Sequence, residues 1–246
     1  MLQLGAVWMT MACTGISPTV RERSLILTPL PVGGLWAILA AMLTGFFLVL
    51  GGYVLGSVPV GFLVGRAYGV DVRRVGSGNI GTANVLRAAG KWAAVFTMLG
   101  DMLKGLVPVI VARLIAGDEW SVAAVALAAI VGHCFPVFLR FKGGKGVATG
   151  AGTSIGLAPV VGIGLFAFWW VVVLVSRYTS LGAIAVMVLS PVAFYLSGQP
   201  TPYVMYTIAG GALVLWKHRE NARALLKGTE RKIGQKAGKK GDARVR

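Results

Sequence analysis

Three short polar segments of this sequence combine glycines with the side chains that bind phosphate. The first runs Gly-Ser-Gly-Asn-Ile-Gly-Thr-Ala-Asn from Gly76 to Asn84, and Arg87 follows it. Glycines allow several backbone N–H groups to converge on one anion, and an arginine can bind phosphate through two parallel hydrogen bonds. We therefore expect an anion site that is formed by Gly76, Ser77, Gly78, Asn79, Asn84 and Arg87.

The same segment has the spacing G-x-G-x-x-G, at Gly76, Gly78 and Gly81, that occurs in dinucleotide-binding domains. This spacing indicates a dinucleotide site only where it follows a strand in a βαβ unit. Here a basic stretch precedes it and apolar stretches surround it, so the pattern favours a more general anion site.

The second segment is the turn Gly143-Gly144-Lys145-Gly146. It resembles a P-loop, but Gly146 stands where the Ser or Thr that holds Mg²⁺ would be. A turn of this kind that opens a helix offers free N–H groups and the positive end of the helix dipole. We expect these four residues to hold phosphate without a metal ion, and the alternative is a flexible basic turn at the lipid headgroups.

The third segment, His218-Arg219-Glu220-Asn221, ends the last apolar stretch. Residues i and i+3 share one face of a helix, so His218 and Asn221 can point into one site. The alternative is a polar helix end whose arginines bind lipid phosphates. The sequence has no Ser-His-Asp arrangement and no His-x-x-x-x-Asp signature, which gives little support to a protein general base.

Ionisable and thiol groups also lie inside the apolar stretches. Asp101 and Lys104 are three residues apart, and because such groups are costly in a membrane, we expect them to form an ion pair. His133 has no carboxylate or second histidine near it in the sequence, which favours a structural hydrogen bond over a metal ligand. Cys13 and Cys134 lack ligand spacing and are expected to be inert packing residues.

Composition indicates the elements that must position these residues. Hydrophobic residues make up 56% of the 246 residues and charged residues 13%, against about 25% charged in soluble domains. A net charge of +16 would suggest nucleic acid in a soluble protein. Here the basic residues lie between apolar runs, so they report membrane topology, and no nucleic-acid partner is expected.

Charge distribution and span length together predict the topology. The loops 65–91 and 140–146 and the C-terminal tail are basic, which places them in the cytoplasm. An outside N-terminus then requires an odd number of crossings. The region 147–175 must therefore be two short spans of about 11 and 16 residues, broken at Pro159, and such a break needs surrounding protein or a water-filled cavity.

The predicted fold is all-α, a polytopic membrane protein with seven transmembrane helices, two of them short. The spans are 35–64, 92–115, 122–139, the two halves of 147–175, 180–196 and 202–216. We divide the chain into a poorly ordered extension (1–34), a seven-span membrane catalytic domain (35–217) and a basic cytoplasmic tail (218–246) that is attracted to anionic lipid.

The three motifs together resemble those of the bacterial acyl-phosphate:glycerol-3-phosphate acyltransferases, the PlsY type: G-S-G-N-I-G-T-A-N, G-H-C-F-P-V-F-L-R-F-K-G-G-K-G-V-A-T and H-R-E-N-A-R-A-L-L-K-G-T-E. The resemblance covers about residues 51–231. It implies a seven-span inner-membrane enzyme with its active site on the cytoplasmic side. Such enzymes transfer a fatty acyl group from acyl phosphate to glycerol 3-phosphate in phospholipid synthesis, giving lysophosphatidic acid and phosphate.

The resemblance also implies roles for particular residues and partners. The catalytic residues that it implies are Ser77, Arg87, Lys145, His218 and Asn221. It implies no metal, coenzyme A or other cofactor, and it suggests a soluble acyltransferase that produces acyl phosphate as a partner. One departure concerns the sixth span, where family members often end an S-L-x-S run with Ser and this chain has Ala183. If that hydroxyl binds phosphate, Ser180 or a water must replace it.

This chemistry suits the residues. Acyl phosphate is already activated, so the enzyme must hold two phosphates side by side, a task for bases and N–H groups. We expect Lys145 and its glycines to neutralise the leaving group, and a substrate phosphate to take the hydroxyl proton. The rival hypotheses are a membrane transporter of phosphate or a phosphoester, and a lipid-binding structural protein. A transporter would need a midplane site and often inverted repeats, and the first half of the chain shows no partner for the break at Pro159.

Overall fold

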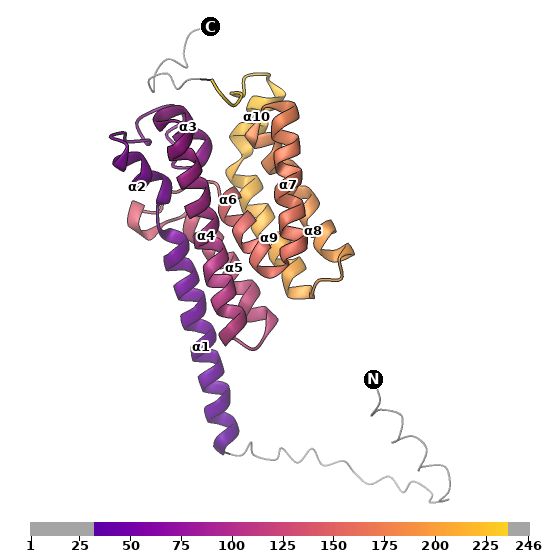
Figure 1. Cartoon of the computed structure of the whole chain (residues 1–246). Coiled ribbons are helices and arrows are strands. Elements are labelled where there is room, and N and C mark those ends of the chain that lie inside the picture. The colour runs from indigo at the N-terminus through magenta and orange to yellow at the C-terminus, as the bar shows by residue number, and fades with distance from the viewer. Residues whose placement is uncertain (1–31, 236–246) are drawn as a thin grey trace, which may run out of the picture. The chain divides into compact units, whose positions relative to one another are not determined.

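The computed structural model describes residues 32–235, and every regular element in this range is helical (Figure 1). The all-α prediction is confirmed for this part of the chain. Most of the predicted extension 1–34, Cys13 and the end of the predicted tail 218–246 lie outside it. The chain divides into two units between Ile38 and Leu39, and all the predicted site residues belong to the second. The helices are α1 (Val32–Ser57), α2 (Val60–Ala67), α3 (Thr82–Ala89), α4 (Lys91–Ile115), α5 (Glu119–Cys134), α6 (Val147–Leu157), α7 (Pro159–Ser176), α8 (Thr179–Leu196), α9 (Thr201–Lys217) and α10 (Arg219–Leu226), with a 3₁₀ turn at Val137–Leu139.

Large apolar side chains are exposed on the long helices, as contact with lipid requires. Examples are Phe46 on α1, Leu114 on α4, and Val160 and Leu174 on α7. Within residues 32–235, five helical stretches are long and apolar enough to cross a membrane: Gly34–Ala67, Lys91–Ile115, Glu119–Leu139, Pro159–Ser176 and Thr179–Leu196. The chain is therefore a helical multi-pass membrane protein. Two of the seven predicted crossings, α6 with 11 residues and α9 with 17, are not among these stretches.

Prolines set several helix boundaries. α6 ends at Leu157 and α7 begins at Pro159, so the predicted break is present. Proline suits the first position of a helix, because the N–H that it lacks would have no helical acceptor there. α5 ends at Cys134, before the predicted end of its span at 139, because Pro136 cannot continue the helical hydrogen bonds.

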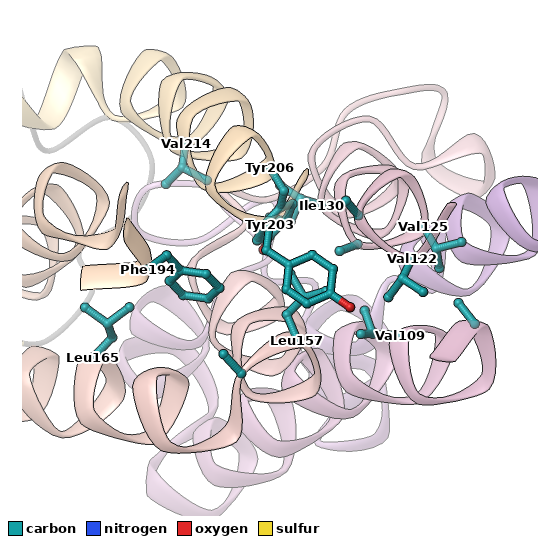
Figure 2. Close-up of a cluster of buried hydrophobic side chains, with 14 of the residues drawn as sticks. Val109, Val122, Val125, Ile130, Leu157, Leu165, Phe194, Tyr203, Tyr206 and Val214 are labelled. Atoms are coloured by element: carbon teal, nitrogen blue, oxygen red, sulfur yellow. The ribbon is translucent and has the colours of Figure 1, made fainter. Parts of the chain in front are cut away.

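α6 lies at the centre of the packing and contacts α4, α5, α7 and α9. Glycines allow α4 and α6 to approach closely: a Cβ on Gly152 would lie 1.9 Å from the carbonyl oxygen of Met102, and one on Gly105 would lie 2.3 Å from that of Thr149. Small residues commonly form such contacts in membranes. The apolar core beside α6 draws side chains from α4 to α9, as Figure 2 shows for Val109, Ile130, Leu157, Leu165, Phe194 and Tyr206.

The glycine-rich segment between α2 and α4 has a small core of its own, formed by Val72, Ile80, Val85 and Ala93. The predicted loop 65–91 therefore contains ordered structure, including helix α3, which packs against α2 and α4. Because this core fixes the segment on α4, the glycine-rich residues are held near the start of α6.

Candidate active site

Asn84, at the start of α3, holds the glycine-rich segment together from within. Its side-chain oxygen accepts a hydrogen bond from the N–H of Ser77 (3.0 Å). Its NH₂ group donates to the carbonyl oxygens of Val72 (2.9 Å), Val75 (3.1 Å) and Asn79 (2.9 Å). These bonds occupy its donors, and the residue is 2% exposed. Asn84 thereby shapes the segment, and its direct contact with phosphate stays a prediction.

Ser77, Gly78 and Asn79 lie nearer the surface than Asn84, whereas Gly76 is buried. Gly76 and Gly78 adopt left-handed backbone angles (φ 62° and 72°), which explains the need for glycine at both positions. Ser77 is exposed, and its Oγ accepts a bond from the N–H of Asn79 at 3.4 Å. The side-chain oxygen of Asn79 in turn accepts from the N–H of Gly81 at 3.2 Å.

Arg87 extends from α3 towards the C-terminal segment of the described chain. Its Nη2 donates to the carbonyl oxygen of Arg231 (3.4 Å), and its buried Nε has no hydrogen-bond partner among the described residues. Burial lowers the pKa of Arg87, the charge of Arg231 lowers it further, and Glu230 opposes the shift. A guanidinium with a free, buried N–H is equipped to bind an anion.

The second segment opens α6, as the sequence predicted. Gly146 is the residue before the helix and has φ 87°, and the first N–H groups of a helix lack helical acceptors. Gly143 and Gly144 are required because there is no space for a side chain. A Cβ on Gly143 would lie 2.2 Å from the carbonyl oxygen of His133, and a Cβ on Gly144 would lie 2.1 Å from Nε2 of the same histidine. The N–H of Gly144 donates to the His133 carbonyl (3.0 Å), so it is already occupied.

Lys145 begins a chain of hydrogen bonds that joins distant segments. Its Nζ donates to the side-chain oxygen of Asn221 on α10. The NH₂ group of Asn221 donates to Glu230 Oε1 (2.7 Å), and the hydroxyl of Ser180 donates to the same oxygen (2.6 Å). Burial lowers the pKa of Lys145, and Glu230 and Glu220 oppose that shift.

Glu230 was not among the predicted site residues. The only sequence signal was its place at the end of the third motif, as one of two acids, with Glu220, among several bases. Ser180 is the hydroxyl nearest in sequence to the departure at Ala183, which is itself buried on α8. The chain therefore has a hydroxyl one helical turn from Ala183, and it is bonded to the same carboxylate as Asn221.

His218 lies at the junction of α9 and α10 and is 5% exposed. Its Nδ1 lies 2.8 Å from the carbonyl oxygen of Val214. Because a carbonyl only accepts, Nδ1 carries the hydrogen, and Nε2 is left with its lone pair. Burial lowers the pKa of His218 to about 4, so the ring is neutral at neutral pH.

A cavity of about 150 Å³ runs from these polar segments into the helices. Its wall includes Asn79, Lys145 and His218 near the loops and Phe166, Trp169 and Met187 from α7 and α8. Ser77, Arg87 and Asn221 do not line it, although Asn221 reaches it through its bond to Lys145. A cavity whose wall combines polar groups from the loops with large apolar side chains from the helices suits a substrate with a charged head and an alkyl chain.

The intramembrane charges form a cluster larger than the predicted ion pair. Lys104 Nζ lies 2.9 Å from Asp101 Oδ1, which confirms the pair. The structural hydrogen bond predicted for His133 is present, since its Nδ1 lies 3.0 Å from Thr149 Oγ1. Asp101 Oδ1 lies 3.6 Å from the same nitrogen, because α4 and α5 bring together two residues that are far apart in the sequence. Within residues 32–235, no group of three or more His, Cys, Asp or Glu side chains is arranged to hold a metal ion.

Residues 46–228 match the family model described as glycerol-3-phosphate acyltransferase. The chain belongs to the glycerol-3-phosphate acyltransferase family. A curated glycerol-3-phosphate acyltransferase of Rubrobacter xylanophilus is 75% identical over 78% of this chain and 96% of that protein. Another from Thioalkalivibrio sulfidiphilus is 48% identical over 82% of this chain and 100% of that protein.

Solved structures of the family resemble this one as well. The crystal structure of PlsY (YgiH), an integral membrane glycerol 3-phosphate acyltransferase, in its glycerol 3-phosphate form has a TM-score of 0.74 and 39% identity. The match covers 77% of this chain and 96% of that one. The lysophosphatidic acid form of that enzyme gives a TM-score of 0.72 with 38% identity. This member of the family is thus an enzyme, an acyltransferase of phospholipid synthesis that resides in a membrane.

Proposed function

We propose that the enzyme transfers a fatty acyl group from acyl phosphate to glycerol 3-phosphate. The observation that carries the proposal is the position of Lys145, which lies where α6 begins and lines a cavity that continues between apolar helices. The ammonium and the first N–H groups of α6 would face the acyl-phosphate headgroup, and the alkyl chain would lie against Phe166 and Trp169. The crystal forms of the PlsY relative with glycerol 3-phosphate and lysophosphatidic acid support the acceptor and the product.

Lys145 has the role of stabilising the leaving phosphate. Its side-chain partner, Asn221, is neutral, so no direct ion pair cancels the ammonium charge, and Glu230 lies one hydrogen bond further away. Preorganised charge in a site shielded from water stabilises a developing anion strongly. The glycines on either side of Lys145 allow the turn to pack closely, Gly144 against His133 and Gly146 against Cys134, and no metal ion is required.

The acceptor phosphate is assigned to Arg87 and Ser77, with Asn79 at the cavity wall. His218 accepts a hydrogen bond at its Nε2 from the glycerol hydroxyl that does not react, since Nδ1 is bonded to Val214. The reacting hydroxyl is thereby left to give its proton to the leaving phosphate. In the reaction the hydroxyl oxygen bonds to the acyl carbon, and the bond from that carbon to the phosphate oxygen breaks. The phosphate leaves with the electron pair and takes the hydroxyl proton.

The seven-crossing topology is part of the proposal, with the N-terminus outside and the active site and the basic tail in the cytoplasm of a bacterial cell membrane. At 1.5 Å per residue, α6 is about 17 Å long and cannot cross a hydrocarbon core of about 30 Å alone. It is surrounded by α4, α5 and α7, the setting in which a helix can end within a membrane. A soluble acyltransferase that makes acyl phosphate would deliver the donor to the cytoplasmic face.

Phosphate release from the purified protein in proteoliposomes tests this function. We expect release to require both acyl phosphate and glycerol 3-phosphate, and Lys145→Ala to abolish it. Lys142→Ala, which changes an exposed base three residues away, is the matched control and should leave the rate unchanged. Wild-type activity in Lys145→Ala, or equal activity with acyl coenzyme A as the donor, would refute the assignment.

A further inference from the structure

The wall of the cavity contains a buried polar network that the proposed reaction does not use. Asp101 and Lys104 come from α4, His133 from α5 and Thr149 from α6. Their residues are 2%, 8%, 3% and 0% exposed, respectively. His133 Nδ1 lies 3.0 Å from Thr149 Oγ1 and 3.6 Å from Asp101 Oδ1. Asp101 and His133 both line the cavity that Lys145 and His218 also line.

This network is balanced in charge and anchored at a helix break. Lys104 Nζ lies 2.9 Å from Asp101 Oδ1 and donates to the carbonyl oxygen of Val58 (2.7 Å), between α1 and α2. Ionisable groups at this depth are costly and usually serve a function. Four elements are thereby tied together: the α1–α2 junction, α4, α5 and α6.

His133 lies directly beneath the phosphate-binding turn. The N–H of Gly144 donates to the His133 carbonyl oxygen (3.0 Å). A Cβ on Gly144 would lie 2.1 Å from Nε2 of the same histidine, so the turn packs directly against the imidazole ring, and only glycine fits at this position. The next residue is Lys145. The orientation of the ring therefore affects where the lysine and the first N–H groups of α6 point.

The other ring nitrogen has the partners that fix this orientation. A carboxylate beside Nδ1 favours the tautomer with hydrogen on that nitrogen and restrains rotation of the ring. Asp101 supplies this carboxylate, and Thr149 supplies a hydroxyl from the first turns of α6. Thr149 of α6 is thus within hydrogen-bond distance of Nδ1, the Asp101 carboxylate faces this nitrogen from α4, and the ring contacts the turn through its opposite edge.

We propose that His133 is a positioning residue for the phosphate turn, and that it acts through the contacts of Nδ1 with Asp101 and Thr149. Held in this way, the ring sets the path of residues 143–145, and so the direction of the Lys145 ammonium. The proposal rests on the function assigned to Lys145 above. It goes further because it assigns the Asp101–Lys104 ion pair an indirect role in binding a phosphate substrate.

Two isosteric replacements test the proposal, because asparagine places its amide near the position of Nδ1 and glutamine places it near that of Nε2. We expect His133→Asn, which keeps the contacts with Asp101 and Thr149 but lacks the ring edge beside Gly144, to lose less activity than His133→Gln. His133→Gln should reduce kcat/KM for acyl phosphate on the order of 10²-fold, the size of effect that a misplacement of about 1 Å produces, and leave KM for glycerol 3-phosphate unchanged. Both variants should melt close to the wild type in the same detergent.

Thr97→Val is the matched structural control. Thr97 is another buried polar residue of α4, and its hydroxyl donates to the Ala93 carbonyl of its own helix (2.8 Å). If His133→Gln does not fold, Thr149→Val provides the second measurement, since it removes an Nδ1 partner while it keeps the shape. It should lower kcat/KM for acyl phosphate without lowering Tm, whereas Thr97→Val should change neither kinetic constant.

The outcomes separate the alternatives. Equal losses in His133→Asn and His133→Gln, accompanied by a lower Tm, would overturn the proposal in favour of simple packing. Activity in His133→Gln with loss in His133→Asn would overturn it in favour of direct substrate contact by Nε2. A selective rise in KM for glycerol 3-phosphate in His133→Gln alone would support positioning by His133, and it would reassign Lys145 to the other phosphate.

Discussion

Lys145 donates a hydrogen bond to the side chain of Asn221, a residue that lies 76 positions later in the sequence. This contact brings the turn at the start of α6 against α10, and Asn221 passes the connection on to Glu230. The lysine is therefore hydrogen-bonded to a neutral amide, and the carboxylate of Glu230 is reached only through the hydrogen bond of that amide. Such an arrangement orients a positive charge without neutralising it directly, as a phosphate site requires.

Removal of Asn221 should weaken catalysis by releasing this lysine. A hydrogen bond to a charged group contributes about 1.5–3 kcal/mol, so we expect Asn221→Ala to lower kcat/KM by about 10-fold or more. Arg223→Ala, an exposed change on the same helix, is the control. Steady-state kinetics of both variants in one detergent check this, and equal rates for the two would contradict it.

Substitution of Gly144 should be far more harmful than its size suggests. A Cβ there would lie 2.1 Å from His133 Nε2, and a buried ring held on its other side cannot move away freely. We expect Gly144→Ala to lose nearly all activity. Gly164→Ala adds the same methyl group in α7, where nothing lies within 4 Å, and activity should remain. A similar loss at both positions would mean that the clash with His133 is not the cause.

Features set by neighbouring residues in the sequence could be predicted, whereas contacts between distant helices could not. The break at Pro159 was predictable, because proline affects its own helix and the charges of the flanking loops required an additional crossing. Helix α3 was missed, because it has only eight residues, too few for a span, and lies within a stretch whose basic residues mark it as a loop. The proximity of Asp101 to His133 and of Glu230 to Ser180 depends on which helices become neighbours. No local pattern specifies these pairings, since each joins residues at least 32 positions apart.

Ser180, and not residue 183, should supply the hydroxyl of this site. Its Oγ donates to Glu230 at 2.6 Å, whereas Ala183 is fully packed on α8 with 1% exposure. We expect Ser180→Ala to lower activity, because Glu230 then loses one of its two donors and Asn221 is held less firmly. Ser197→Ala removes an exposed hydroxyl just after α8, which donates to the Ala193 carbonyl, and is the control. Initial rates at saturating substrate check this, and an unaffected Ser180→Ala would contradict it.

The burial of His218 predicts how stability depends on pH. Its pKa is lowered from the ordinary value of 6.5 to about 4, so the unfolded chain binds a proton at a pH where the folded chain does not. Stability therefore falls as the pH drops from about 6.5 to about 4. We expect Tm in detergent to decrease over this window, and to decrease less in His218→Asn, which keeps a donor for the Val214 carbonyl. Identical pH dependence in the two proteins would exclude His218 as the cause.

The topology can be tested at the two short helices, because α6 and α7 together must return the chain to the face where α6 starts. Single cysteines are placed at Asp118, Lys142 and Lys227 in a background where Cys13 and Cys134 are alanine. An impermeant maleimide should label Asp118→Cys in intact cells, and should label Lys142→Cys and Lys227→Cys only after permeabilisation. Six crossings would instead expose position 227 outside while 142 stayed inside. Labelling of Lys227→Cys in intact cells would therefore show that α6 and α7 form one span, and that the basic tail is not beside the cytoplasmic site.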